Sequence, residues 1–402
     1  MTPPAPTLRN VHGLFRRWLG EEYDLDAINA VLATAAAERL SGDPALWLLL
    51  VSGPGNAKTE TVQALYGAGA IITSTITSEG ALLSATPHRE KAKRAHGGLL
   101  RRIGTRGVLV IKDVTSILSM HRDTRASMLA AFREVNDGYW ERNVGTGGGQ
   151  TLQWQGRIAV VGAVTTAWDR AHDVIASMGD RFVLLRMDSR VGREAARQQA
   201  LRNTGNESVM RLHLAEVVGA VVSRVQPAEG VRLSADEMER IGRAADLVTL
   251  CRTGVEYDWR GQVVDADAPE MPTRFAKQLA QLVRGAVAVG MERTQAVRLA
   301  IRCARDSMPP LRLAILEDVA LNPRSRTSDV RVRLSKPWHT VDRQMQALHM
   351  LGVLTCDEVE LSENKSRWYY SLAAQTDPSV LRTQNLSVHI DGETRKDDVV
   401  TY

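Results

Sequence analysis

Cysteine is nearly missing from this sequence. Three cysteines, Cys251, Cys303 and Cys356, occur among 402 residues. They are far apart, and neither a C-x-x-C pair nor a histidine cluster accompanies them, so the pattern indicates neither a disulfide framework nor a zinc site. A chain of this kind fits a reducing compartment, and we expect the protein in the cytoplasm.

Long apolar runs and a strong excess of one charge are also missing. Residues 1–7 lack the basic-then-apolar order of a signal peptide, and no apolar run approaches the roughly 18 residues of a membrane span. We therefore expect no contact with a membrane. The formal net charge is only +5. This small excess permits an anionic partner without requiring one.

The clearest motif begins at Trp47, where an apolar strand runs into a Gly/Pro turn and then reaches Lys58 and Thr59. Such a turn, followed by a helix, directs backbone N–H groups and the positive helix end at one point, which favours a bound phosphate. Lys58 would then contact the β- and γ-phosphates of ATP, and the Thr59 hydroxyl would bind Mg²⁺. The predicted ATP-binding residues are Gly53, Pro54, Gly55, Asn56, Ala57, Lys58, Thr59 and Glu60.

This stretch departs from the phosphate-loop pattern G-x-x-x-x-G-K-[ST] at two places. Ser52 stands at the first glycine, and Ala57 stands immediately before the lysine. Gly53 and Gly55 are then the residues that supply the turn. The alternative interpretation is an ordinary strand–turn–helix with a surface lysine.

A second apolar strand begins at Gly107 and ends in an acid at Asp113. A helix at 114–120, a hairpin, a strand at 157–166 that ends in two threonines, and an Arg-Phe pair at 181–182 follow in that order. Together with the phosphate loop, this order resembles the AAA+ ATPase family over residues 45–375. The resemblance implies an α/β fold: a P-loop AAA+ core with a parallel sheet, a helical lid and a C-terminal winged helix-turn-helix.

The same resemblance and the helical patterns divide the chain into five parts. We expect a helical N-terminal lead-in at 1–44 and a nucleotide-binding core at 45–200. A helical lid at 201–305 and a winged helix at 306–375 would follow. Residues 376–402 are polar and mixed in charge, which predicts a flexible tail.

The resemblance also implies roles for the acid strand. In the family this strand usually ends in Asp-Glu, whereas this chain has Lys112 and Asp113. Asp113 would orient a water, hold Mg²⁺ through water, or do both. A helix N-cap is the alternative role of this aspartate. Reduced or absent hydrolysis is equally compatible with the departure from Asp-Glu.

Four further positions complete the catalytic set that the resemblance implies. Thr165 or Thr166 would be the polar sensor that positions the attacking water. Arg181 stands where the family has its arginine finger, which completes a neighbouring subunit's site, and Arg186 is the fallback. Arg274, in the first turn of a predicted lid helix, would be the second sensor. Ordinary surface roles are the alternative for each of these residues.

Two alternating segments around a run of glycines predict a β-hairpin at 136–154. In one branch of the family, a hairpin at this place projects into the pore of a ring. Arg142 and the Gly-rich tip would therefore contact a nucleic-acid backbone, and a purely structural hairpin is the alternative. The basic run at 88–96 is either a solvated helix face or a contact with DNA or a partner.

The C-terminal part predicts helices at 311–320, 327–334 and 338–350, followed by two strands around a polar turn. This order resembles a winged helix-turn-helix, whose third helix would meet base edges and whose wing would meet phosphate. Many winged helices bind proteins instead, so a protein partner is the alternative. The predicted nucleic-acid-binding residues are His339, Thr340, Arg343 and Gln344 in the helix and Asn364, Lys365 and Arg367 in the wing.

Two functions follow from these patterns. The first is a ring-forming ATPase that uses ATP and Mg²⁺ and acts on DNA, as a helicase-like motor or a replication initiator of phage or mobile-element origin. The second is a winged-helix DNA-binding regulator that ATP switches, with little or no hydrolysis.

Overall fold

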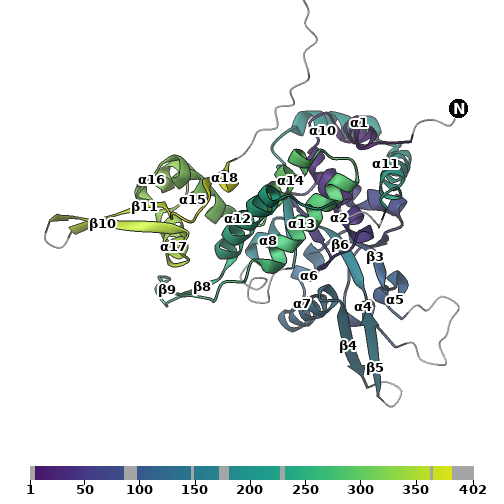
Figure 1. Ribbon diagram of the computed structural model, residues 1–402, viewed down its shortest axis with the longest axis horizontal. Helices are drawn as coiled ribbons and strands as arrows, with labels where there is room; N and C mark the ends of the chain where they lie inside the picture. Colours follow the sequence, from purple (N-terminus) through teal and green to yellow (C-terminus); the bar gives the residue numbers. More distant parts are fainter. Residues whose placement is uncertain are drawn as a thin grey trace, which may run out of the picture.

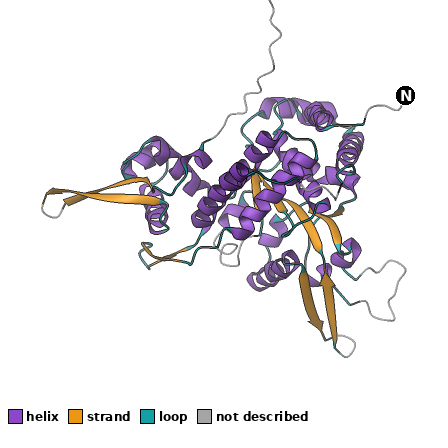
Figure 2. Ribbon diagram, viewed as in Figure 1, coloured by secondary structure: helices purple, strands orange, loops and turns teal. Residues whose placement is uncertain are grey.

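The computed structural model describes residues 5–85, 97–145, 149–171, 181–226, 231–362 and 365–382. At its centre lies a sheet of five parallel strands in the order β2-β3-β6-β1-β7 (Figures 1 and 2). The strands are β1 (Trp47–Val51), β2 (Ile71–Thr73), β3 (Arg106–Ile111), β6 (Arg157–Val164) and β7 (Val183–Arg186). The predicted α/β class with a parallel sheet is confirmed.

The inner strand β1 explains why the sequence there shows no polar alternation. β1 pairs with β6 on one side and with β7 on the other. Leu48 and Leu50 join the apolar cluster on one face of the sheet, whereas Trp47, Leu49 and Val51 join the cluster on the other face. A central parallel strand that is buried on both faces requires such a continuous apolar run.

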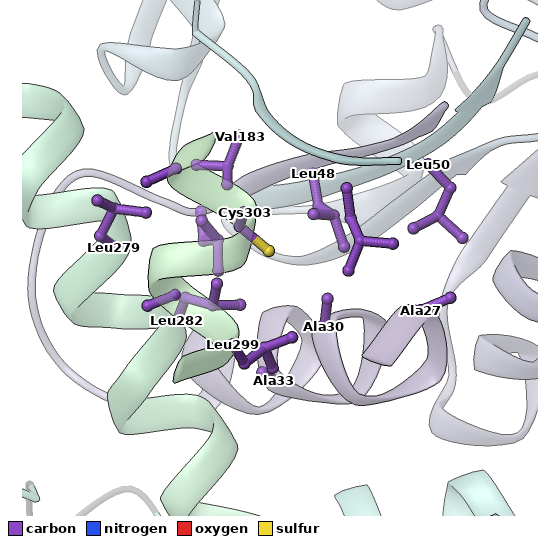
Figure 3. Packing of buried hydrophobic residues seen from close by; sticks show 14 of the residues in the cluster. Ala27, Ala30, Ala33, Leu48, Leu50, Val183, Leu279, Leu282, Leu299 and Cys303 are labelled. Carbon is purple, nitrogen blue, oxygen red and sulfur yellow. The ribbon is translucent and has the colours of Figure 1, made fainter. Parts of the chain in front are cut away.

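Helices from both ends of the chain cover the first face of the sheet. They are α2 (Leu25–Arg39), α13 (Thr273–Ala288) and α14 (Arg293–Asp306). Figure 3 shows Ala30 of α2 and Leu299 of α14 within the same apolar cluster as Leu48. A Cβ at Gly285 of α13 would overlap the carbonyl of Ala33 in α2, so the glycine permits this close approach.

The second face of the sheet carries α7 (Arg122–Asn136) and the predicted hairpin. This hairpin consists of β4 (Tyr139–Val144) and β5 (Gln150–Gln155), which pair antiparallel. Trp140, Leu152 and Trp154 are buried on the hairpin's inner face and join the second cluster. The hairpin therefore packs on the core at its base and extends away from the sheet (Figure 1).

The remaining helices surround this core or connect its strands. None of the described helices is long and apolar enough to span a membrane. They are α1 (Leu8–Leu19), α3 (Lys58–Gln63), the 3-10 helix η1 (Ala64–Ala68), α4 (Glu79–Leu82), α5 (Leu99–Ile103), α6 (Thr115–Leu118), α8 (Ala167–Arg170), α10 (Arg193–Asn203), α11 (Glu207–Val222) and α12 (Ala235–Arg252).

A second hairpin separates α12 from α13. It is formed by β8 (Val255–Tyr257) and β9 (Val263–Ala266), which pair antiparallel with a register shift after Glu256. Figure 1 shows it reaching from the helices of the predicted lid toward the C-terminal domain.

The C-terminal domain has the predicted order of three helices and two strands. Val330, Val341 and Met345 are fully buried and form part of its core. The elements are α15 (Pro310–Leu321), α16 (Thr327–Leu334), α17 (Trp338–Met350), β10 (Leu354–Ser362) and β11 (Lys365–Leu372).

The prediction of a flexible tail from residue 376 is wrong at its start. A short helix, α18 (Pro378–Leu381), begins there, and the Asp377 side chain caps it by accepting a hydrogen bond from the Ser379 N–H at 2.8 Å. Val380 and Leu381 are buried. These two apolar side chains dock the segment on the domain. The rest of the expected tail, 383–402, lies outside the described residues.

Candidate nucleotide site and nucleic-acid interface

The loop after β1 closes on the side chain of Lys58. The Lys58 ammonium donates to the Ser52 carbonyl at 3.0 Å and to the Gly53 carbonyl at 2.6 Å. Lys58 is 8% exposed, and this burial lowers the pKa of its ammonium, while Asp113 acts in the opposite direction. The positive charge is therefore held at the mouth of the loop, where it can meet a phosphate.

The backbone of the loop keeps a left-handed turn immediately before the lysine. Ala57 has φ of 52° and precedes the first residue of α3, and Gly55 has φ of 78°. The phosphate-loop pattern has glycine where Ala57 stands, because L side chains are strained in this region. The chain thus adopts the conformation that the pattern needs, even though it lacks the glycine.

The other predicted ATP-binding residues differ in how far they are already engaged. Pro54, Gly55 and Thr59 are exposed. The Asn56 amide donates to the Met187 carbonyl at 3.4 Å. Glu60 forms a bidentate ion pair with Arg211 of α11, with N···O distances of 2.7 and 2.9 Å. Glu60 thus links two helices.

Strand order brings the acid strand and the sensor strand to the same edge as the loop. β6 lies between β1 and β3, and all three run parallel. The carboxyl ends of parallel strands meet at one edge of a sheet. Lys58, Asp113 and Thr165 therefore lie along one edge, and Asp113 acts electrostatically on Lys58.

A residue that the sequence did not single out, Thr115, connects the acid and sensor strands. Asp113 is exposed, and its Oδ1 accepts a hydrogen bond from the Thr115 N–H at 2.9 Å. The Thr115 hydroxyl accepts from the Thr165 N–H at 3.2 Å and lies 3.4 Å from the Thr165 hydroxyl. The Asp-x-Thr spacing after a strand is the signal of an Asx-turn that could have indicated this role.

The two candidate sensor threonines are not equivalent. Thr165 carries the contacts with Thr115, and its Oγ1 also accepts from the Ala167 N–H at 3.3 Å. Thr166 is exposed and precedes α8 without a side-chain cap. The geometry favours Thr165 over Thr166.

The Asp113 carboxylate accepts a hydrogen bond within its own turn, but Asp113 is not the helix N-cap that was its alternative role, because Val114 is the N-cap of α6. One oxygen, Oδ1, is used in the turn, and the side chain remains exposed. Among the described residues, no three His, Cys, Asp or Glu side chains group as a metal site. Thr59 and Asp113 offer hard oxygen donors at the loop edge, which suits Mg²⁺ when phosphates and water supply the other ligands. The residues present fit that ion.

Arg181 lies at the opposite edge of the sheet from the loop. It precedes β7, whose first residue, Val183, pairs with Leu48 at the start of β1. Arg181 forms an ion pair with Asp137 at 3.6 Å, and its carbonyl accepts from Gln278 of α13 at 2.7 Å. The chain cannot use this arginine at its own loop.

Arg274 lies near Arg181 and not near Lys58. It forms an ion pair with Glu270. Burial lowers the pKa of Arg181, and the positive charge of Arg274 lowers it further. The structure therefore does not bring Arg274 to the loop of its own chain. The expectation that Arg274 is the second sensor is therefore wrong for its own chain's loop, because α13 begins at the amino-terminal edge of the sheet.

The fallback residue Arg186 lies at the loop edge but is fully engaged. Its guanidinium donates to both carboxylate oxygens of Asp169, at 2.7 and 3.0 Å. Its backbone N–H donates to Asp306 at 2.8 Å. Burial raises the pKa of Asp306 to about 6. This arrangement joins the edge strand β7 to α14.

Arg142 was expected to contact a nucleic-acid backbone, but its side chain turns back to the protein. Its Nη1 donates to the Leu83 carbonyl at 2.9 Å, and its Nε lies 3.4 Å from Glu79. Arg142 thus anchors the hairpin to the α4 segment, which corrects the expectation of an available phosphate contact. The hairpin tip at 146–148 and the basic run at 88–96 lie outside the described residues.

The third helix of the C-terminal domain presents only part of its predicted face. His339 and Thr340 are exposed at the start of α17. Gln344 accepts from Arg312 at 2.9 Å and donates to the Tyr257 hydroxyl at 3.4 Å. A Cβ at Gly261 would overlap the guanidinium of Arg343. Tyr257 and Gly261 both belong to the β8–β9 hairpin segment.

The predicted wing is a long antiparallel pair, β10 and β11. Arg367 is exposed and pairs with Val359 across the strands. Lys365 begins β11, but its side chain and Asn364 lie outside the described part. Other arginines of the domain form internal ion pairs, which reduces the charge available to phosphate. These pairs are Arg324–Asp357, Arg326–Asp329 and Arg333–Asp318.

Solved structures include chains that are similar to this one. No protein-family model and no curated protein matches the sequence. Among solved structures, the chain is similar to the Orc1 protein of Aeropyrum pernix, solved in complex with DNA. The identity is 14%, the match covers 91% of this chain and 94% of that chain, and the TM-score is 0.26. A similarity this low assigns no role to any residue of this chain.

Proposed function

We propose that this chain binds ATP with Mg²⁺ at the loop edge of its sheet and acts as an ATPase on DNA, as a motor or a replication initiator. One observation carries the proposal. Lys58 closes the loop at the edge where Asp113 and the Thr115–Thr165 pair also lie. A buried ammonium, exposed hydroxyl groups and a carboxylate then face one bound triphosphate.

Each of these residues has a distinct task. Lys58 and the loop N–H groups would bind phosphate oxygens, and the Thr59 hydroxyl would bind Mg²⁺. The metal ion supplies electrostatic stabilisation of the charge on the transferred phosphoryl group. Asp113 would orient the attacking water, and Thr165, held by Thr115, would fix the position of that water.

The acid strand supports a second candidate function, an ATP-switched DNA-binding regulator. Lys112 replaces one acid of the usual Asp-Glu pair, and Asp113 uses one oxygen to cap its own turn. Steady-state ATP turnover, measured with and without duplex DNA, separates the two candidates. DNA-stimulated turnover is expected for the motor or initiator. ATP-dependent DNA binding without turnover would establish the switch.

We further propose that the active form is a ring in which Arg181 completes the site of a neighbouring subunit. Its place at the edge opposite Lys58 supports this role, because that place separates Arg181 from the loop of its own chain. We expect little turnover from Arg181→Ala or Lys58→Ala alone. A mixture of the two should recover activity, since some interfaces then combine an intact loop with an intact arginine.

The mixing experiment has a clear contrary outcome. If Arg181→Ala turns over ATP normally, or if the wild type stays a monomer with ATP and DNA in sedimentation, the ring is excluded. Arg170→Ala, an exposed arginine on the short helix after the sensor strand, is the matched control and should keep its activity.

A further inference from the structure

The β8–β9 hairpin lies against the helix that would contact bases. β9 packs on α17, the Tyr257 hydroxyl accepts from Gln344, and Gly261 lies under the Arg343 guanidinium. Gly261 has φ of 77°, so the turn itself favours glycine there. Figure 1 shows the hairpin beside α17. Two of the four predicted base-contacting side chains therefore already contact the hairpin: Gln344 is half-buried, whereas Arg343 stays exposed.

A buried arginine links the base of the hairpin to α17. Arg312 of α15 is 5% exposed, and its Nη1 donates to the carbonyls of Cys251 and Thr253 at 2.8 and 2.7 Å. Those carbonyls lie at the end of α12, where the hairpin begins. The Nε of the same guanidinium donates to Gln344 at 2.9 Å. The hairpin base and the middle of α17 thus share one buried hydrogen-bond donor.

The hairpin also carries charge that opposes DNA. Segment 255–266 contains three acids, Glu256, Asp258 and Asp265, and one arginine, Arg260. Segment 327–350, which holds α16 and α17, contains four Lys or Arg residues and two acids. A net acidic hairpin on net basic helices is electrostatically favourable, and the same acids repel an approaching phosphate backbone.

Two of these acids are placed where they weaken the hairpin itself. Glu256 and Asp265 are direct cross-strand partners, and both are exposed. Like charges directly opposite each other destabilise an antiparallel pair. The hairpin is therefore poorly stabilised by its own strands, and its contacts with α17 contribute more of its order. Such an element can leave without unfolding a core.

We propose that the β8–β9 hairpin is an internal gate that occupies Arg343 and Gln344 on the base-contacting face of α17 and must move away before duplex DNA is bound there. The gate rests on the proposed DNA binding by α17. DNA and the hairpin compete for Arg343 and Gln344, so the apparent affinity for DNA is lowered by the fraction of molecules in which the hairpin is docked.

The test uses the full chain with the hairpin shortened. Val255 and Ala266 are direct strand partners, so a Gly-Ser-Gly link can replace 256–265 without moving α12 or α13. Duplex affinity is measured by fluorescence anisotropy at low salt for the wild type and the shortened variant. We expect the shortened variant to bind roughly 10-fold or more tightly, because the docked fraction no longer reduces the affinity.

Two point variants keep the test informative if the shortened chain does not fold. Tyr257→Ala removes the contact with Gln344 and should tighten binding by roughly threefold or more. Trp259→Ala is the matched control, because this tip residue is 85% exposed and is stacked by Arg260. It should leave the duplex affinity unchanged. Weaker binding by Trp259→Ala would instead make the hairpin a stacking platform for DNA.

The outcomes separate the gate from the function on which it rests. If the wild type binds DNA and the shortened chain, or Tyr257→Ala where that chain is unfolded, binds equally or more weakly, the gate is wrong and DNA binding stands. If no variant binds any duplex at low salt, both the gate and the proposed DNA binding by α17 are wrong.

Discussion

The predicted residues at the loop edge of the sheet and those on α17 differ in what they contact. At the loop edge, Thr59 and Asp113 are exposed, and Lys58 is held by the carbonyls of Ser52 and Gly53 and by the Ser52 hydroxyl. On α17, Arg343 and Gln344 already contact another element of the same chain. The difference separates a site whose side chains contact only their own loop or turn from one whose side chains contact a separate hairpin. Contact with a second element, and not residue type, distinguishes the two regions.

A substitution at the acid of the loop edge should have the largest effect. Asp113→Asn keeps the turn, because an amide oxygen can still accept from the Thr115 N–H, but it removes the negative charge that orients water. We expect turnover to fall by roughly 10²–10⁴-fold, with ATP affinity nearly retained. The check is steady-state phosphate release beside nucleotide titration.

The control for this variant is Asp123→Asn, an exposed aspartate near the start of α7. It should turn over ATP at the wild-type rate. Undiminished turnover by Asp113→Asn would place the catalytic acid elsewhere, and the loop edge would then be a binding site only.

Removing the lysine of the loop should have the next largest effect. Lys58→Ala deletes the charge-assisted contacts to phosphate and leaves the Ser52 and Gly53 carbonyls without their donor. We expect ATP binding to weaken by about 1.5–3 kcal/mol, measured by calorimetry. Lys277→Ala, an exposed lysine of α13, is the control and should bind ATP normally. Equal affinities for Lys58→Ala and the wild type would exclude the phosphate loop.

Sequence patterns predicted the two regions well where local order decides the structure. The strand, turn and Lys-Thr pair of the loop lie within a few residues, and α16 and α17 begin and end where their patterns predicted. Each depends on spacing that a short segment sets by itself. The parallel sheet was expected from the resemblance of the motif order to the AAA+ family.

Contacts between distant segments could not be predicted in this way. Arg142 turning to Leu83, Arg274 lying beside Arg181 and Tyr257 covering Gln344 each join residues far apart in the chain. A basic side chain on a helix or hairpin looks the same in sequence whether it faces phosphate or a carbonyl. Tertiary packing alone settles which partner it has.

The smallest expected effect concerns the one loop residue whose type disagrees with its conformation. Ala57 has φ of 52°. A left-handed alanine costs roughly 1–2 kcal/mol, and glycine loses roughly 0.5–1 kcal/mol more backbone entropy on folding. Ala57→Gly should therefore raise the free energy of unfolding by about 0.5–1 kcal/mol in urea titration. Ala276→Gly, inside α13, should lower it by about 1 kcal/mol. Loss of stability in both variants would mean that the loop does not hold this turn in solution, and the N–H groups would then not be aimed at one phosphate.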